Sequence, residues 1–300
     1  MKQLVTLWKF SRPHTIIGSV ISICTLAVIV CEKSASQHFP LLIIALAIGI
    51  SCNIFIVGIN QIADVNIDKI NKPYLPLASG ALNCQQATYI IMTALLISLG
   101  LGLYLSPYLF GIIVLAAAIG WAYSMPPLHL KQHHVLATLA ITTVRGVLIN
   151  LGGFLVFNYL VNRSLVIPEN VIILTIFIVV FSIAISWFKD LPDVEGDAHY
   201  NIKTFAILYS PKVVLISGHI LVGLAYLFTI FFKYRDFWAA AIPSFEMKAL
   251  LYGHVVLLGL FLCNAFSIRL DEHVSVKKFY KRFWWFFFAE YLLYLIAYVG

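Results

Sequence analysis

Two short acidic stretches, NQIADVNID and DLPDVEGD, contain the side chains of this sequence with the clearest chemical potential. In the first, an amide and two carboxylates recur every four residues at Asn60, Asp64 and Asp68. A four-residue step advances an α-helix by about 400°, so these side chains fall on one slowly drifting stripe. Asp193 and Asp197 repeat the step in the second stretch. The spacing therefore predicts two polar faces rich in carboxylates.

The chemistry that such faces suit is the binding of hard divalent cations. Mg²⁺ prefers oxygen ligands and commonly takes one or two carboxylates, while water and substrate phosphates complete its shell. The two stretches contain six of the thirteen acidic residues in the chain. Two acidic faces opposed across a bundle would suit two or more Mg²⁺ ions that bridge a diphosphate. The alternative is that the acids belong to solvated loops and pair with Lys69, Lys72 and Lys189.

The rest of the chain is too apolar for a water-soluble protein. Hydrophobic residues make up 61% of the sequence, charged residues 11%, and the mean hydropathy is +0.94. Soluble domains contain roughly 45–50% apolar residues. The apolar runs are long and do not alternate, which favours membrane-spanning helices over a barrel. We therefore predict an all-α, polytopic membrane protein that forms one transmembrane domain over residues 1–300.

Nine apolar runs approach the ~20 residues that cross a hydrocarbon core. The predicted spans are Thr15–Val30, Pro40–Ile59, Thr88–Leu105, Leu109–Tyr123, Val135–Phe157, Val171–Phe188, Val213–Phe232, Ala249–Ile268 and Phe283–Val299. Both acidic stretches follow even-numbered spans, so both should emerge on the same membrane face.

The basic residues predict which face that is. The N-terminus and the loops after even-numbered spans hold 14 Lys and Arg residues, whereas the alternate loops hold 5. The positive-inside rule places the richer set, and the acidic stretches with it, on the cytoplasmic face or its stromal equivalent. The net charge of +7 predicts attraction to anionic membrane lipids. Because the basic residues are scattered over loops, no nucleic-acid partner is predicted, and nothing indicates an oligomeric state.

The motifs carry a resemblance to the UbiA superfamily of intramembrane prenyltransferases. NQIADVNIDKINKP resembles the NxxxDxxxD motif of that superfamily, and DVEGD resembles its second motif, DxxxD. The chain further resembles the homogentisate prenyltransferase branch in FSRPHTIIGS, NKPYLPLASG, TVRGVLINLG, FKDLPDVEGD and FFAEYLLY. The resemblance implies nine transmembrane helices around a central cavity, with both acidic motifs at its polar end.

The resemblance also implies an activity. An allylic diphosphate ionises with the help of Mg²⁺, and an electron-rich aromatic ring attacks the carbocation. In the homogentisate branch a phytyl or geranylgeranyl group passes to homogentisate with loss of CO₂, in tocopherol and prenylquinone biosynthesis. Solanesyl diphosphate as donor and 4-hydroxybenzoate as acceptor are alternatives. A membrane transporter is a more remote one, since intramembrane acids also mark ion pathways.

Matching motif positions imply the residues of the site. Asp64, Asp68, Asp193 and Asp197 are the predicted catalytic residues. The residues predicted to hold Mg²⁺ are Asn60, Asp64, Asp68, Asp190, Asp193 and Asp197. Those predicted to bind diphosphate are Lys131, Tyr123, Arg145, Lys72 and Lys189, and the predicted acceptor contacts are Arg12 and Asn150. The segment WAYSMPPLHLK resembles the YSxPPxRxK segment of the family, but His129 stands where many relatives have Arg. A neutral imidazole donates only one hydrogen bond, so the bidentate contact that Arg makes with diphosphate would be lost.

Two further charges lie within predicted spans, where an unpaired charge is costly. Arg145 should contact a diphosphate, the carboxylate of the acceptor, or a buried acidic partner. Glu290 must be protonated or paired. Aromatic side chains near the polar end could shield a carbocation from water, and the candidates are Tyr123, Phe181 and Trp187.

Overall fold

A computed structural model describes residues 2–31, 37–199 and 203–299. Within these ranges the chain is built from helices, and its one isolated bridge pairs His133 with Lys203. The elements are α1 (Lys2–Phe10), α2 (Pro13–Cys31), α3 (Phe39–Ala63), α4 (Val65–Asn71), α5 (Cys84–Leu105), α6 (Pro107–Ser124), η2 (Leu130–Gln132), α7 (His134–Thr142), η3 (Thr143–Gly152), α8 (Gly153–Asn162), α9 (Glu169–Phe188), α10 (Val194–His199), α11 (Phe205–Tyr209), α12 (Pro211–Ala239), α13 (Phe245–Ala265) and α14 (His273–Val299). The all-α prediction is confirmed.

Eight segments of the described chain are long and apolar enough to span a membrane. They are α2, α3, α5, α6, the continuous run from α7 through η3 to α8, α9, α12 and α13. These segments match the first eight predicted spans, although α13 ends at Ala265 rather than Ile268. The chain is therefore an integral, multi-pass membrane protein.

The ninth predicted span, Phe283–Val299, lies within α14 but does not join that group of eight. Arg282, Glu290 and several Tyr and Trp side chains lower the hydropathy of this helix. It nevertheless packs within the bundle, against α2, α9 and α13. The predicted count of nine membrane spans therefore stays a prediction.

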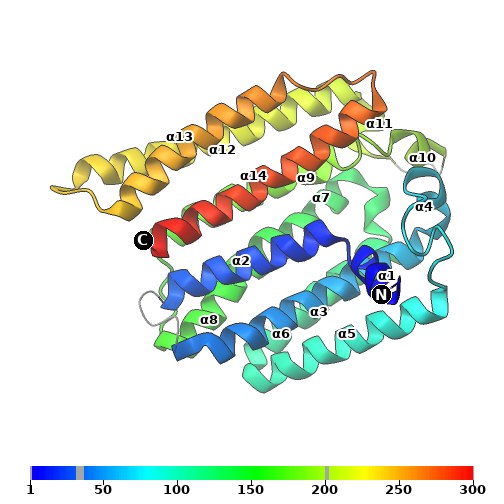
Figure 1. Ribbon diagram of the computed structural model, residues 1–300, viewed down its shortest axis with the longest axis horizontal. Helices are drawn as coiled ribbons and strands as arrows, with labels where there is room; N and C mark the ends of the chain where they lie inside the picture. The colour runs from blue at the N-terminus through cyan, green and yellow to red at the C-terminus, as the bar shows by residue number, and fades with distance from the viewer. Residues whose placement is uncertain (1, 32–36, 200–202, 300) are drawn as a thin grey trace.

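The long helices lie side by side with their axes roughly aligned (Figure 1). The short helices α4 and α10, which carry or adjoin the two acidic stretches, contact each other at one end of the bundle (Figure 1). We call this the acidic end, defined by Asp64, Asp68, Asp193 and Asp197. The opposite end, where α9 begins and α12 ends, is called the far end. Helix α9 has 20 residues, so the two ends are about 30 Å apart along it.

Local signals in the sequence account for several helix boundaries. The side chain of Asn83 accepts a hydrogen bond from the backbone N–H of Gln86 at 2.8 Å, and the Gln86 side chain accepts one from Asn83 at 3.1 Å. This reciprocal cap fixes the start of α5. At the start of α6, Ser106 caps the helix and is followed by Pro107, whose missing N–H costs nothing in the first turn.

The core of the C-terminal half is largely aromatic. Phe181 of α9 and Phe283 of α14 stack with ring centroids 4.4 Å apart and an interplanar angle of 10°. Phe188 and Tyr226 are also fully buried among these helices. Offset or edge-on aromatic pairs add about 0.5–1.5 kcal/mol beyond the burial of their area. Phe181, a predicted carbocation shield, is thus a packing residue that joins α9 to α14.

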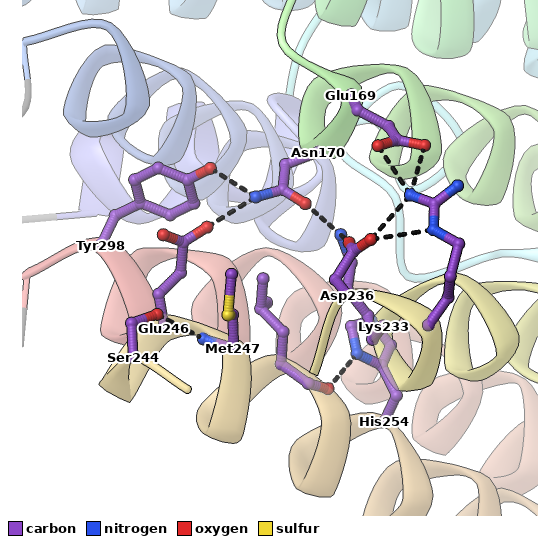
Figure 2. Close-up of polar contacts among 11 residues, drawn as sticks. Glu169, Asn170, Lys233, Asp236, Ser244, Glu246, Met247, His254 and Tyr298 are labelled. Atoms are coloured by element: carbon purple, nitrogen blue, oxygen red, sulfur yellow. Dashed lines mark hydrogen bonds and ion pairs between the residues drawn. The ribbon is translucent and has the colours of Figure 1, made fainter. Parts of the chain in front are cut away.

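At the far end, a polar cluster joins the last four long helices (Figure 2). Asn170 at the start of α9 donates hydrogen bonds to Glu246 Oε1 at 2.5 Å and to the hydroxyl of Tyr298 at 2.8 Å. The amide oxygen of Asn170 accepts a hydrogen bond from Lys233, which is 2% exposed. These contacts connect α9, α12, α13 and α14, so the far end is fastened independently of the acidic end.

Candidate active site

The first acidic stretch straddles the break between two helices. Helix α3 ends at Ala63, and Asp64 lies between α3 and α4 with φ −100° and ψ 10°. Backbone hydrogen bonds continue across the break, from Asp64 N to Asn60 O at 3.0 Å and from Asp68 N to Asp64 O at 2.7 Å. Asn60 Nδ2 donates to Asp64 Oδ2 at 2.9 Å, as the four-residue spacing predicts.

The second acidic stretch forms a turn followed by the short helix α10. Asp193 lies just before α10, and Asp197, within it, donates its backbone N–H to Asp193 O at 3.0 Å. Asn71 at the end of α4 reaches this turn, since its Nδ2 donates to the backbone oxygen of Asp193 at 3.4 Å. The two acidic stretches therefore meet, although 122 residues separate Asn71 from Asp193.

One lysine links the two stretches directly. Lys72 Nζ contacts a carboxylate oxygen of Asp193 and lies 3.9 Å from Asp68 Oδ1. Arg12 approaches the same aspartate from the start of α2, with its Nη2 3.9 Å from Asp68 Oδ2. The positive φ of 51° at Arg12 marks the sharp turn between α1 and α2 that presents this residue.

Two further lysines each pair with one acid, the first in the first stretch and the second in the second stretch. Lys131, in the turn after α6, contacts Asp64 Oδ1. Lys189 Nζ lies 3.0 Å from Asp190 Oδ1 and donates to the hydroxyl of Tyr123 at 2.8 Å. The structure thus brings Lys72, Lys131, Lys189, Tyr123 and Arg12 to the acidic end, where the sequence predicts a diphosphate site.

These charges are buried, which argues against the solvated-loop interpretation. Asp68 is 4% exposed, Asp197 8% and Lys131 8%. Lys72 and Lys189 do pair with acids, as that interpretation expects, but they do so between packed helices. Burying paired charges costs desolvation free energy. Their retention between helices therefore favours a functional site over a set of solvated loop acids.

Burial raises the pKa of several of these acids. The pKa of Asp197 rises to about 7 through burial and the nearby charges of Asp190 and Asp193. Burial also raises the pKa of Asp68, against the opposing effect of Lys72. Burial lowers the pKa of Lys131, although Asp64 opposes the shift. The ionised carboxylates are therefore under-stabilised, and additional positive charge at the acidic end would favour them.

The donor set fits Mg²⁺ chemically. It consists of oxygen ligands, and Asp68 Oδ2 is a buried oxygen without a hydrogen-bond donor. The predicted ligands are not gathered into one shell, however. In the part of the chain that the structure describes, no three His, Cys, Asp or Glu side chains lie close enough to hold one metal ion. Lysine side chains lie against several of the carboxylates instead.

Arg145 lies outside this lysine group. It belongs to η3, a π-helical segment, and its guanidinium carbon sits 4.7 Å from the ring centroid of Trp284 and 5.2 Å from that of Phe287. Asn150, predicted as an acceptor contact, is fully buried. Its Nδ2 donates to the backbone oxygen of Arg145 at 3.0 Å, and its Oδ1 accepts from the hydroxyl of Tyr291 at 2.7 Å. Asn150 therefore orders the backbone at Arg145.

The structure also places two other predicted residues. Glu290 is paired, as expected, because its Oε1 lies 3.0 Å from His254 Nε2 in a fully buried contact. Trp187 stacks on Phe205 with centroids 4.8 Å apart, so it covers α11. Among the three predicted aromatic shields, Tyr123 is the one that contacts a cation of the acidic end, through Lys189.

Sequence reasoning missed Trp284 and His14 as members of the site. Their rings lie 4.8 Å apart, edge to face, beside Arg145. His14 falls within FSRPHTIIGS, which already resembled the family and could have drawn attention to it. Trp284 is one of 43 aromatic residues, and nothing in the sequence distinguishes it from the others.

Together, the fold and the acidic end define a class: a helical, multi-pass membrane protein with a buried cluster of carboxylates and lysines at one end of its bundle. Residues 21–287 match the UbiA prenyltransferase family. The chain belongs to this family of enzymes, as its motifs predict.

Similar proteins agree with this assignment. The chain is 36% identical to the homogentisate phytyltransferase of Synechocystis sp., over 99% of this chain and 96% of that protein. It is 32% identical to the chloroplastic homogentisate solanesyltransferase of Arabidopsis thaliana, over 96% of this chain and 75% of the relative. A UbiA homologue from Archaeoglobus fulgidus, solved with GPP and Mg²⁺, shares the fold with a TM-score of 0.64 at 16% identity, covering 97% and 99% of the two chains.

Proposed function

We propose that the protein is a Mg²⁺-dependent prenyltransferase that moves a phytyl or geranylgeranyl group from its diphosphate to homogentisate, with loss of CO₂. The observation that carries the proposal is the meeting of two buried acidic motifs through Lys72 at one end of the bundle. Relatives named for homogentisate with phytyl, geranylgeranyl and solanesyl donors support the acceptor and leave the solanesyl donor as an alternative.

Six residues of the acidic end would hold Mg²⁺, and the ion would neutralise charge on the leaving diphosphate. These residues are Asn60, Asp64, Asp68, Asp190, Asp193 and Asp197.

Lysine side chains of the acidic end also stabilise the diphosphate of the prenyl donor. When diphosphate enters, Lys72, Lys131 and Lys189 exchange part of their contact with carboxylates for contact with phosphate oxygens. The allylic C–O bond breaks and its electron pair leaves with the diphosphate, whose charge therefore grows. Fixed ammonium groups stabilise that growing charge more in the transition state than in the ground state. Tyr123, hydrogen-bonded to Lys189, positions one of these ammonium groups.

The allylic cation then accepts an electron pair from the aromatic ring, which forms the new C–C bond, and the attacked ring carbon loses its proton. The side chain of the acceptor loses CO₂ and takes up a proton in its place. This step requires that water be excluded, because water would capture the cation. Burial of Asp68, Asp197 and Lys131 within the helix bundle supports that exclusion. We further propose that the acidic end faces the cytoplasm or its stromal equivalent, as the distribution of Lys and Arg predicts.

The proposal is tested with purified protein, homogentisate and a panel of phytyl, geranylgeranyl and solanesyl diphosphates. Mass spectrometry of the products should show a prenylated, decarboxylated quinol with at least one donor. Added 4-hydroxybenzoate, the competing acceptor, should yield little or no product. EDTA should abolish turnover, and excess Mg²⁺ should restore it. The absence of product with every donor, or turnover that survives EDTA, would refute the proposal.

A further inference from the structure

A second polar site lies beside the lysine group and uses a different cation. The Arg145 guanidinium is placed over the rings of Trp284 and Phe287. Unlike Lys72 and Lys131, it forms no ion pair or hydrogen bond with any described side chain. A cation within a membrane-spanning segment is costly without an anionic partner, and such residues mark binding sites. Arg145 is therefore available for an anion that enters from outside the protein.

Trp284 brings a second donor to the same place. The residue is 4% exposed, and its buried Nε1–H lies near the hydroxyl of Tyr280 but has no acceptor in good hydrogen-bond geometry. A buried donor without a partner costs about 1–3 kcal/mol, so its retention in a packed core suggests that a ligand satisfies it. The edge-to-face contact with His14, 4.8 Å between centroids, holds the indole ring in place.

The backbone around Arg145 is built to fix its position. Segment η3 is π-helical, a rare geometry that is frequent at functional sites. Gly146 lets η3 approach α9 closely, since a Cβ there would lie 2.6 Å from Val179 Cγ2 and 3.1 Å from Val179 Cα. Asn150 binds the carbonyl of Arg145 and is itself fixed by Tyr291. The cation is therefore held in advance of ligand binding, which reduces the entropic cost of recognition.

The chemistry of this site fits an aromatic carboxylate. A guanidinium forms two parallel hydrogen bonds with a carboxylate, and an indole N–H can donate a third to it. The rings of Trp284 and Phe287 lie against the guanidinium and give the site aromatic surroundings. The site also adjoins the donor end, because His14 follows two residues after Arg12, whose guanidinium lies 3.9 Å from Asp68.

We propose that Arg145, together with Trp284 Nε1, binds the carboxylate of the aromatic acceptor and makes the enzyme specific for carboxylated acceptors. This inference rests on the proposed function and refines it, because the sequence placed Arg145 among the diphosphate-binding residues and left the carboxylate of the acceptor and a buried acidic partner as alternatives. Lys72, Lys131 and Lys189 already provide three cations among the acidic motifs, whereas Arg145 contacts none of the described carboxylates there. Asn150 acts as a positioning residue for Arg145.

Kinetics with one substrate varied at a time test the assignment. In Arg145→Gln, the KM for homogentisate should rise by about tenfold or more, while the KM for the prenyl diphosphate stays within about twofold. Arg145→Lys should recover part of the loss, because lysine keeps the positive charge but cannot form the two parallel hydrogen bonds of a guanidinium. Trp284→Phe should raise the acceptor KM by a smaller factor. The matched controls are Arg163→Gln and Trp285→Phe, the latter at a residue that is 68% exposed, and both should behave as wild type.

Equilibrium binding provides a readout that does not depend on turnover. Wild-type protein should bind homogentisate more tightly than its methyl ester, by about tenfold or more, and Arg145→Gln should bind the two equally. An unchanged acceptor preference in Arg145→Gln would overturn the inference. So would weaker binding of inorganic pyrophosphate in that variant with an unchanged acceptor KM, which would return Arg145 to the diphosphate. If wild-type protein forms no product with any donor, the proposed function fails instead.

Discussion

At the scale of the residue, most carboxylates of the acidic end lie in contact with, or close to, a cation. Asp64 contacts Lys131, Asp190 contacts Lys189, and Lys72 is shared between Asp68 and Asp193. Because Lys72 is shared between the two acidic motifs, the distance between the motifs should change when a charged ligand enters the acidic end. Added phosphate would attract the lysines, and released carboxylates would be free to take a metal ion. The pairs therefore suggest a site that rearranges its charges upon binding.

Neutralising single carboxylates tests this arrangement. Asp64→Asn and Asp193→Asn keep the shape of the side chain but remove the charge that holds Lys131 and Lys72. Turnover should fall by about 10²–10³-fold, comparable to the loss of a principal electrostatic contact in an active site. Steady-state rates in detergent or liposomes measure the effect, and size-exclusion profiles establish that the variants remain folded.

The matched control for these variants is Asp236→Asn at the far end. Asp236 also pairs with a basic residue, Arg235, at 2.6 Å, so this variant loses a charge of the same kind away from the site. It should keep its activity within about twofold, since the pair is exposed to solvent and lies away from the site. Near-normal turnover of Asp64→Asn or Asp193→Asn would contradict the role of both acidic motifs.

At the scale of the element, the sequence predicted the long apolar helices but not how they deviate from regularity. Apolar length alone places α3 or α9, because a membrane span must satisfy its own backbone. A π-helical segment such as η3 adds one residue to a turn, and no hydrophobic period records that change. The break at Asp64, between α3 and α4, was likewise absent from the predicted stripe. Both irregularities occur where polar side chains are presented.

For the residues of the site, too, the sequence predicted some contacts and missed others. The four-residue spacing gave the contact between Asn60 and Asp64, and the shared membrane face brought Asp193 near them. Lys72 and Lys189 were named as possible partners of the acids, but the pairing of Lys72 with Asp193, across 121 residues, depends on helix packing and was beyond prediction. The cluster of His14 and Trp284 was also hidden, since single aromatic residues leave no pattern in so aromatic a chain.

The close contact of η3 with α9 gives a prediction for the element itself. Gly146→Ala would place a methyl group against Val179, including its backbone Cα at 3.1 Å, and should force the two helices apart. Overpacking of this kind costs about 1–3 kcal/mol. Thermal unfolding in detergent should therefore show a Tm lowered by several degrees, about 2–4 °C for each kcal/mol.

The control for this variant is Gly223→Ala in α12. A Cβ at Gly223 would meet nothing within 4 Å, so the change adds only helix propensity, worth up to about 1 kcal/mol. Its Tm should be unchanged or slightly higher. Equal Tm values for the two variants would show that η3 and α9 do not need this close approach.

At the scale of the whole molecule, the bundle carries different polar chemistry at its two ends. The acidic end gathers carboxylates and lysines into a site, whereas the far end joins α9, α12, α13 and α14 through Asn170 and its partners (Figure 2). Fastening the helices at the far end leaves the acidic end free to adjust its charges when substrates bind. The division also gives each end a fixed relation to the membrane, which can be measured.

Cysteine labelling from one side of the membrane tests the predicted orientation. In a background with all five native cysteines replaced by Ser, two single-cysteine variants report on the two ends. Asn66→Cys marks α4 at the acidic end, and Ala241→Cys marks the connection between α12 and α13 at the far end, both at exposed positions. A membrane-impermeant maleimide added to intact spheroplasts should label Ala241→Cys at once. It should label Asn66→Cys only after permeabilisation, because the loops at the acidic end carry most of the Lys and Arg residues and stay in the cytoplasm. Both variants must retain prenyl transfer for the comparison to count, and the opposite labelling pattern would place the acidic end outside.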